Sequence, residues 1–305
     1  MEHNPLLDVG LPISLAIIMA GMGLTLTLRD FRNVLVWPRA MIAGSIAQIF
    51  ILPVLAFGLV VLLQLPPLLA VGLIVIAACP GGGMSNVLTF LARGNVALSI
   101  IMTVVASFVT IVTLPLFTNL AINVFTAQDM DVPMSLPFWR SVNTLLIVVL
   151  LPVALGMMLR ARRPELALKA ERAVSIFGVM VLTFLVLIII WQTRGEVDTL
   201  LASAGPAALA LNFTGVALGF TATLIPGISR RDVLTLAIEL AMKNGTIGLM
   251  VTLTLLDSYI MAMPSAVYGV MMYGLGAALV VWGRRQRFDN AGNPVPRRRR
   301  PEGSV

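Results

Sequence analysis

Long apolar segments alternate with short polar loops along almost the whole chain. Most of these segments reach the roughly 20 residues that a helix needs to cross a bilayer. The pattern therefore predicts an all-α polytopic membrane protein. We predict nine transmembrane helices, at residues 11–28, 38–64, 68–92, 95–125, 137–160, 173–193, 200–225, 231–256 and 262–283.

Two polar stretches interrupt segments that are otherwise apolar. One is residues 79–86, with the sequence CPGGGMSN, and the other is residues 239–246, with the sequence ELAMKNGT. Irregular backbone at membrane depth is tolerated only where it is buried in protein or lines a cavity. A pair of interrupted helices, one in each half of a chain, is typical of the binding site of a secondary transporter.

Composition supports the membrane assignment and argues against an enzyme. The chain is 58% hydrophobic and 11% charged, whereas soluble domains contain about 25% charged residues. Its single cysteine, Cys79, excludes an internal disulfide bond, and we expect it to be a small buried residue. The single histidine, His3, lies near the N-terminus, and no spacing of side chains is typical of a transition-metal site or a catalytic nucleophile.

Positive charge predicts the orientation. All Lys and Arg residues except Arg140, Arg194 and Lys243 fall in one set of alternate loops or in the C-terminal tail. By the positive-inside rule the C-terminus is cytoplasmic and the N-terminus is outside, which requires an odd number of spans. The net charge of +7 therefore needs no nucleic-acid partner, and the tail arginines 297–300 could contact anionic membrane lipid. The N-terminus lacks the positive region of a signal peptide, so we expect a retained first helix.

The two halves of the chain predict an inverted repeat. Gln48 precedes Ser85 by nearly the same number of residues as Asn212 precedes Gly248. Five predicted spans separate the corresponding elements, so the halves would have opposite orientations in the membrane, as in many secondary transporters.

Glu239 and Lys243 are charged residues near the middle of the predicted span 231–256. They are spaced i and i+4, on one face of a helix. A charge at the bilayer centre costs roughly 2.5–3.5 kcal/mol, so each needs a partner or a use; a structural ion pair is the alternative. The following Asn244-Gly245 predicts a helix end, with Lys243 in the last turn, where the helix dipole favours a cation.

Neutral oxygen ligands lie near the first interruption. Ser85 and Asn86 follow it, and Ser99 and Thr103 are one turn apart in the next span. Such oxygens suit a hard cation such as Na⁺, although interhelical hydrogen bonding is the alternative. The half-helices that restart after the two breaks present free N–H groups that attract anions. Together these features predict an organic carboxylate that moves with a cation.

These motifs resemble the bile acid:sodium symporter family. The resemblance covers roughly residues 10–285 and is strongest at 21–26, 47–48, 79–99, 238–239 and 244–245. It implies inverted repeats, with a core domain containing two crossed discontinuous helices and a separate panel domain. The implied divisions are a first panel helix and loop (1–37), the first half of the core (38–125), panel helices (126–199), the second half of the core (200–284) and an Arg-rich cytoplasmic tail (285–305).

The resemblance also implies ligands. One sodium site would use Ser85, Asn86, Ser99, Thr103 and Glu239. A second would use Gln48, Glu239 and backbone near Leu240 and Met242, with a glutamine where this chain has Lys243. We hypothesise that Lys243 replaces the second ion; alternatively, it deprotonates and couples transport to H⁺. The expected substrate-binding residues are Gly83, Met84, Asn244, Gly245, Thr246 and Tyr273, with packing at a helix interface the alternative for Tyr273.

The predicted function is Na⁺-driven symport of a small carboxylate, such as pantoate or a keto acid, rather than of a bile salt. The expected location is a bacterial inner membrane. A cation/proton antiporter using Glu239 and Lys243, and an intramembrane sensor that binds a metabolite without transporting it, are the alternatives. The sequence does not predict the oligomeric state.

Overall fold

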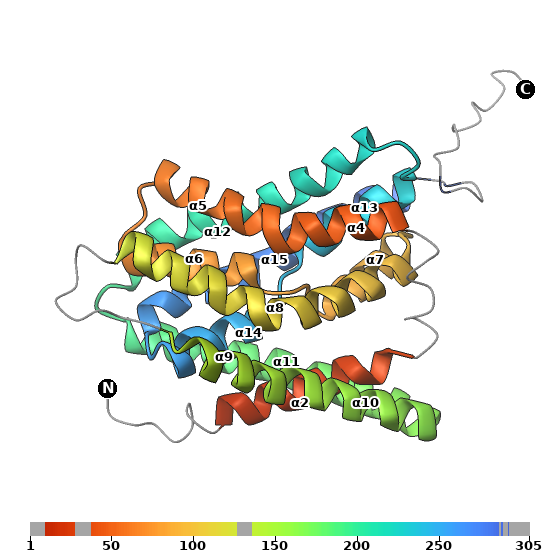
Figure 1. Ribbon diagram of the computed structural model, residues 1–305, viewed down its shortest axis with the longest axis horizontal. Helices are drawn as coiled ribbons and strands as arrows, with labels where there is room; N and C mark the ends of the chain where they lie inside the picture. The colour runs from red at the N-terminus through yellow and green to blue at the C-terminus, as the bar shows by residue number, and fades with distance from the viewer. Residues whose placement is uncertain (1–9, 28–37, 127–135, 287, 289–291, 293–305) are drawn as a thin grey trace, which may run out of the picture.

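The computed structural model describes residues 10–27, 38–126, 136–286, 288 and 292, and its named elements over these ranges are all helical (Figure 1). The first half contains α2 (Gly10–Thr25), α4 (Pro38–Ile46), the π-helical turn η2 (Ala47–Ile51), α5 (Leu52–Leu62), α6 (Pro67–Ala78), α7 (Met84–Leu91) and α8 (Val96–Phe125). The remainder contains α9 (Phe138–Leu145), η3 (Leu146–Leu150), α10 (Leu151–Arg162), α11 (Pro164–Gln192), α12 (Val197–Thr221), η4 (Ala222–Leu224), α13 (Arg230–Ala241), α14 (Gly245–Met250), η5 (Val251–Leu255) and α15 (Tyr259–Arg285).

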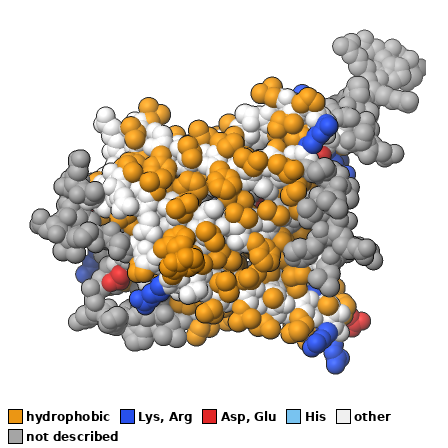
Figure 2. Space-filling view, viewed as in Figure 1, with side chains coloured by type: hydrophobic (Ala, Val, Ile, Leu, Met, Phe, Trp, Pro, Cys, Tyr) orange, Lys and Arg blue, Asp and Glu red, His pale blue; other side chains and the backbone are white. Residues whose placement is uncertain are grey.

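Six helical stretches among the described residues are long and apolar enough to cross a membrane, and three shorter apolar helices accompany them. Apolar side chains cover the middle of the face seen in Figure 2, and charged side chains lie toward its two ends. A bilayer would shield the former and leave the latter in water. The chain is therefore an integral membrane protein, while the count of nine spans stays a prediction.

The helices begin and end within a few residues of the predicted spans, except that one helix begins earlier than predicted. The predicted span 173–193 lies within α11, which begins at Pro164. Proline at the first helical position suits a helix start, so helical structure extends through a charged stretch that we had predicted to be a loop. His3, Arg29, Arg32 and the arginines 297–300 lie outside the described residues.

The helices pack in layers along the long axis of the molecule (Figure 1). α2 packs against α10 and α11 along the lower side of this view. α12 packs against α13 and α15, α15 against α6, and α6 against α8. The division into core and panel domains stays a prediction.

The two interruptions meet as antiparallel extended segments. Gly81 and Lys243 form an isolated antiparallel bridge. Gly82 N donates to Met242 O at 2.8 Å, and Asn244 N donates to Pro80 O at 2.9 Å. Each broken helix therefore supplies hydrogen bonds that the other has lost, which lets irregular backbone exist at membrane depth. We refer to residues 80–82 and 242–244 as the crossing.

The helix that precedes the second interruption ends earlier than predicted. α13 ends at Ala241, and Met242 leaves helical geometry with φ −99° and ψ 86°. Lys243 is thus beyond the helix and not in its last turn, because its backbone pairs with the other broken helix. Asn244 does not close α13 either: its side chain accepts from Ile247 N at 3.2 Å and begins α14.

Candidate functional site

Glu239 lies on α13 with its side chain fully buried. The hydroxyl of Ser99 donates to its Oε2 at 2.7 Å, and the hydroxyl of Thr103 donates to Oε1. Ser99 and Thr103 are one turn apart on α8, so both face α13. The carboxylate is thus held by neutral donors from a neighbouring helix.

A polar contact one turn away aligns these two helices. The side chain of Asn95 donates to Asp232 Oδ1 at 2.7 Å, and its backbone N–H donates to Thr235 Oγ1 at 2.7 Å. Asn95 precedes Ser99 by one turn on α8, and Thr235 precedes Glu239 by one turn on α13. The contact at the helix starts therefore sets the register in which Ser99 meets Glu239.

α7 completes a group of oxygen atoms around Glu239. Ser99 Oγ lies 2.8 Å from Asn86 Oδ1. Ser85 is fully buried, and its hydroxyl has no hydrogen-bond partner among the described residues. The structure thus brings together Ser85, Asn86, Ser99, Thr103 and Glu239, and oxygen atoms of these kinds are ligands that suit a hard cation.

Lys243 makes contacts that its sequence spacing did not predict. Its side chain is fully buried. Its ammonium donates to Cys79 O at 3.1 Å and, at the limit of hydrogen bonding, to Gln48 O at 3.5 Å. Gln48 lies in the π-helical turn η2, and both atoms of its side-chain amide are buried without a partner. The side-chain nitrogen of Lys243 therefore lies beside the backbone carbonyl oxygens of Cys79 and Gln48.

The carbonyl groups at the ends of α6 and α13, the helices before the two breaks, accept hydrogen bonds from different kinds of donor. Ala241 O, at the end of α13, accepts from Asn212 Nδ2 at 3.0 Å and from the hydroxyl of Tyr268 at 2.7 Å. Cys79 O, at the end of α6, accepts from the ammonium of Lys243. The end of α13 thus has two neutral donors, whereas the end of α6 has the side-chain nitrogen of Lys243. Sequence reasoning missed Tyr268, which belongs to no motif.

The predicted backbone ligands Leu240 and Met242 are both buried. Met242 O accepts from Gly82 N within the crossing. Leu240 O faces α12, since a Cβ added at Gly215 would lie 2.7 Å from it. The Lys243 side chain donates to Cys79 O and Gln48 O. Among the described residues, no hydrogen bond from it to Leu240 O or Met242 O is seen.

Two glycines beside the crossing have opposite surroundings. A Cβ at Gly81 would collide with Glu239 Oε1 and lie 3.3 Å from Gln48 Nε2. A Cβ at Gly83 would meet nothing within 4 Å. Gly81 thus allows the backbone to approach the carboxylate, whereas Gly83 borders open space.

That open space is a cavity of about 380 Å³ between the crossing, α2 and α11. All six residues predicted to bind substrate line it: Gly83, Met84, Asn244, Gly245, Thr246 and Tyr273. Sequence reasoning missed the opposite wall, which includes Thr25 of α2 together with Glu171 and Ser175 of α11. The cavity touches the crossing but is bounded by helices from distant parts of the chain.

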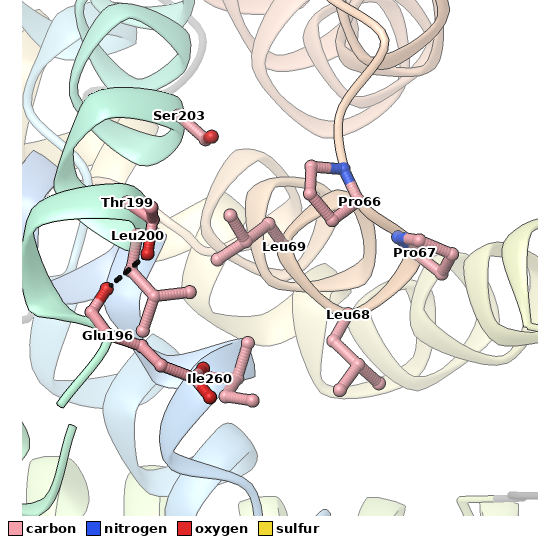
Figure 3. A pocket seen from close by; sticks show the side chains of 9 residues that line it. All are labelled: Pro66, Pro67, Leu68, Leu69, Glu196, Thr199, Leu200, Ser203 and Ile260. Carbon is pink, nitrogen blue, oxygen red and sulfur yellow. Dashed lines mark hydrogen bonds between the residues drawn. The ribbon is translucent and has the colours of Figure 1, made fainter.

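A second cavity, of about 570 Å³, lies where α6, α12 and α15 begin (Figure 3). Its lining is mostly apolar, with Pro66 and Leu69 facing the polar side chains of Thr199 and Ser203. Thr199 donates to Glu196 O at 2.8 Å. None of the residues predicted to form a site contributes to this lining.

The chain is similar in sequence to known proteins. Residues 12–199 match the Sodium Bile acid symporter family. The chain is 34% identical to the probable sodium/metabolite cotransporter BASS1, chloroplastic, of Arabidopsis thaliana, over 89% of this chain and 66% of that protein. It is 32% identical to the sodium-dependent transporter YocS of Bacillus subtilis, over 92% of this chain and 85% of that protein. It is 27% identical to the human ileal sodium/bile acid cotransporter, over 78% and 67% of the two chains.

The chain spans slightly less than two thirds of the plant relative's length, and it matches most of the bacterial relative. All three relatives have names that describe sodium-dependent transport or cotransport, and none is named as an enzyme. With a family match that covers more than half of the chain, we conclude that this protein belongs to the sodium bile acid symporter family.

Proposed function

We propose that the protein is a secondary active symporter that moves a small organic anion together with Na⁺. The observation that supports this best is the convergence of Glu239 with neutral oxygen atoms of α7 and α8 beside a cavity at the crossing. A single carboxylate among hydroxyl and amide oxygens suits a weakly held monovalent cation. A cation bound there would lie next to the anion, so each would strengthen the binding of the other by the same factor.

The proposed sodium ligands are Ser85, Asn86, Ser99, Thr103 and Glu239. We further propose that the Lys243 ammonium takes the place of a second cation, beside Gln48, Leu240 and Met242. Its hydrogen bonds to Cys79 O and Gln48 O support this assignment, because carbonyl oxygens also bind cations. The expected coupling is one Na⁺ per anion, and two Na⁺ per cycle in proteoliposomes would contradict it.

The proposed substrate site is the cavity beside the crossing, with Gly83, Met84, Asn244, Gly245, Thr246 and Tyr273 in its wall. α7 begins there without a side-chain cap. Its Ser85 N–H donates to Gly82 O, and the other N–H groups of the first turn are the donors that we propose for a carboxylate. The volume of about 380 Å³ suits a metabolite of the size of pantoate or a keto acid.

The proposed architecture has nine transmembrane helices in two inverted repeats. The core would comprise 38–125 and 200–284, and the panel would comprise 1–37 and 126–199, followed by the tail 285–305. In a bacterial inner membrane with the N-terminus outside, α2 ends and α11 begins on the cytoplasmic side. The cavity, which reaches Thr25 and Glu171, would then face the cytoplasm, and transport would expose it alternately to the two sides.

Thermal stability of the purified protein tests the sodium site. NaCl is titrated against KCl at constant ionic strength and at several pH values. A ligand at 100 times its Kd stabilises a protein by about 2.7 kcal/mol, so we expect a saturable Na⁺-specific rise in Tm. Carboxylates are then screened in saturating Na⁺, and transport is measured in proteoliposomes.

Proton coupling is the second candidate, because Glu239 and Lys243 are both ionisable and fully buried. Tm that depends on pH but is equal in NaCl and KCl would support it and contradict the sodium proposal. A cation/proton antiporter built on a direct Glu239–Lys243 pair receives less support, since the two groups bind different partners: Glu239 accepts from hydroxyls, and Lys243 donates to carbonyls.

A further inference from the structure

Among the residues that the structure describes, two charged side chains line the cavity beside the crossing, Lys243 and Glu171. The Lys243 side chain ends at Cys79 O and Gln48 O, to which its nitrogen donates. Glu171 comes from the opposite wall and is half-buried. Its carboxylate is therefore the charged group that the described part of α11 presents to a bound anion.

Glu171 lies toward one end of the cavity. α11 contributes lining residues from Glu171 to Leu182, and a Cβ added at Gly269 of α15 would lie 3.4 Å from Leu182. Glu171 and Gly178 are separated by about 10 Å along α11, at 1.5 Å per residue. α2 ends and α11 begins at the same end of the molecule (Figure 1), so Thr25 and Glu171 lie at that end of the cavity.

We propose that Glu171 is a specificity-determining residue that makes this cavity favour monocarboxylates over dicarboxylates, an inference that rests on the proposed function. A ligand whose carboxylate contacts N–H groups at the start of α7 directs the rest of its length toward α11. A second carboxylate would then approach the like charge of Glu171 in a partly dehydrated space, which opposes binding. A hydroxyl at the same place would instead donate to the Glu171 carboxylate.

The electrostatic part of this proposal can be measured without a known substrate. The chain has one native cysteine, Cys79, which is buried, whereas position 83 borders open space. A Gly83→Cys variant can therefore react with methanethiosulfonate reagents, and the rates with a cationic and an anionic reagent are compared. We expect Glu171→Gln in this background to lower the cationic-to-anionic rate ratio by about threefold or more, because it removes a negative charge from the cavity wall.

Glu165→Gln is the matched control, since Glu165 is exposed in the first turn of the same helix and does not line the cavity. It removes an equal charge and should leave the rate ratio unchanged. The unmodified chain shows how far Cys79 itself reacts.

Ligand selection is measured by protection of Gly83→Cys from the reagents in saturating Na⁺, with hexanoate and adipate as acids of equal length. We expect hexanoate to protect at a concentration about tenfold below that of adipate, and Glu171→Gln to remove most of this preference. Protection by hexanoate with an unchanged rate ratio and an unchanged preference in Glu171→Gln overturns the inference alone. Failure of both acids to protect overturns the proposed function, and with it the inference.

Discussion

At the scale of single residues, the proposed coupling depends on the charge of Glu239. We expect Glu239→Gln to abolish the difference in Tm between NaCl and KCl, because the amide keeps the size of the side chain and removes the charge that balances Na⁺. The loss corresponds to about 2.7 kcal/mol at 100 times the Kd. Glu165→Gln, in the exposed first turn of α11, is the control, and a Na⁺-specific shift that survives in Glu239→Gln would exclude the carboxylate as a ligand.

Tyr268 allows a second test at this scale. Its hydroxyl donates to Ala241 O, which also accepts from Asn212. Tyr268→Phe should lower the free energy of unfolding by about 1 kcal/mol, because one of two donors to a buried carbonyl is lost. Tyr273→Phe is the control, since Tyr273 lines the cavity. A larger loss of stability in Tyr273→Phe than in Tyr268→Phe would contradict the assigned role of the Tyr268 hydroxyl.

At the scale of elements, the first broken helix depends on glycine where its break approaches Glu239. We expect Gly81→Ala to weaken Na⁺ binding at least about tenfold, because the added methyl group collides with the Glu239 carboxylate and the backbone cannot move without breaking the crossing. Gly83→Ala is the matched variant, since its methyl group enters open space. Na⁺ titrations of Tm compare the two, and equal Na⁺ affinities would show that the crossing adjusts freely.

These elements also show what the sequence could predict. Glycine, proline and polar residues within apolar segments predicted both interruptions, because each residue type disfavours a continuous membrane helix. The pairing of Pro80 with Asn244 was not predictable, since it joins residues distant in the chain. The i, i+4 spacing of Glu239 and Lys243 gave the wrong neighbours because α13 ends between them. Glu171 was missed because the predicted span began at residue 173, while α11 begins at Pro164.

At the scale of the whole molecule, the two cavities lie at different ends of the helices. One reaches Thr25, near the end of α2 and the start of α11, and the other lies where α6, α12 and α15 begin. In the proposed orientation the first faces the cytoplasm and the second faces outward. A bilayer therefore separates them, and a reagent that cannot cross the membrane reaches each from one side.

We predict that Gly83→Cys reacts with a membrane-impermeant thiol reagent in inside-out vesicles and reacts little in right-side-out vesicles. Ser203→Cys, in the other cavity, should show the opposite sidedness. Each variant serves as the control for the other, because both share the buried Cys79 and the introduced cysteines lie in different cavities.

Equal labelling of Gly83→Cys from both sides in the absence of Na⁺ would indicate that the carrier samples both conformations when empty. Labelling of Gly83→Cys only from outside, together with labelling of Ser203→Cys only from the cytoplasm, would reverse the proposed orientation and require the positive loops to face outward.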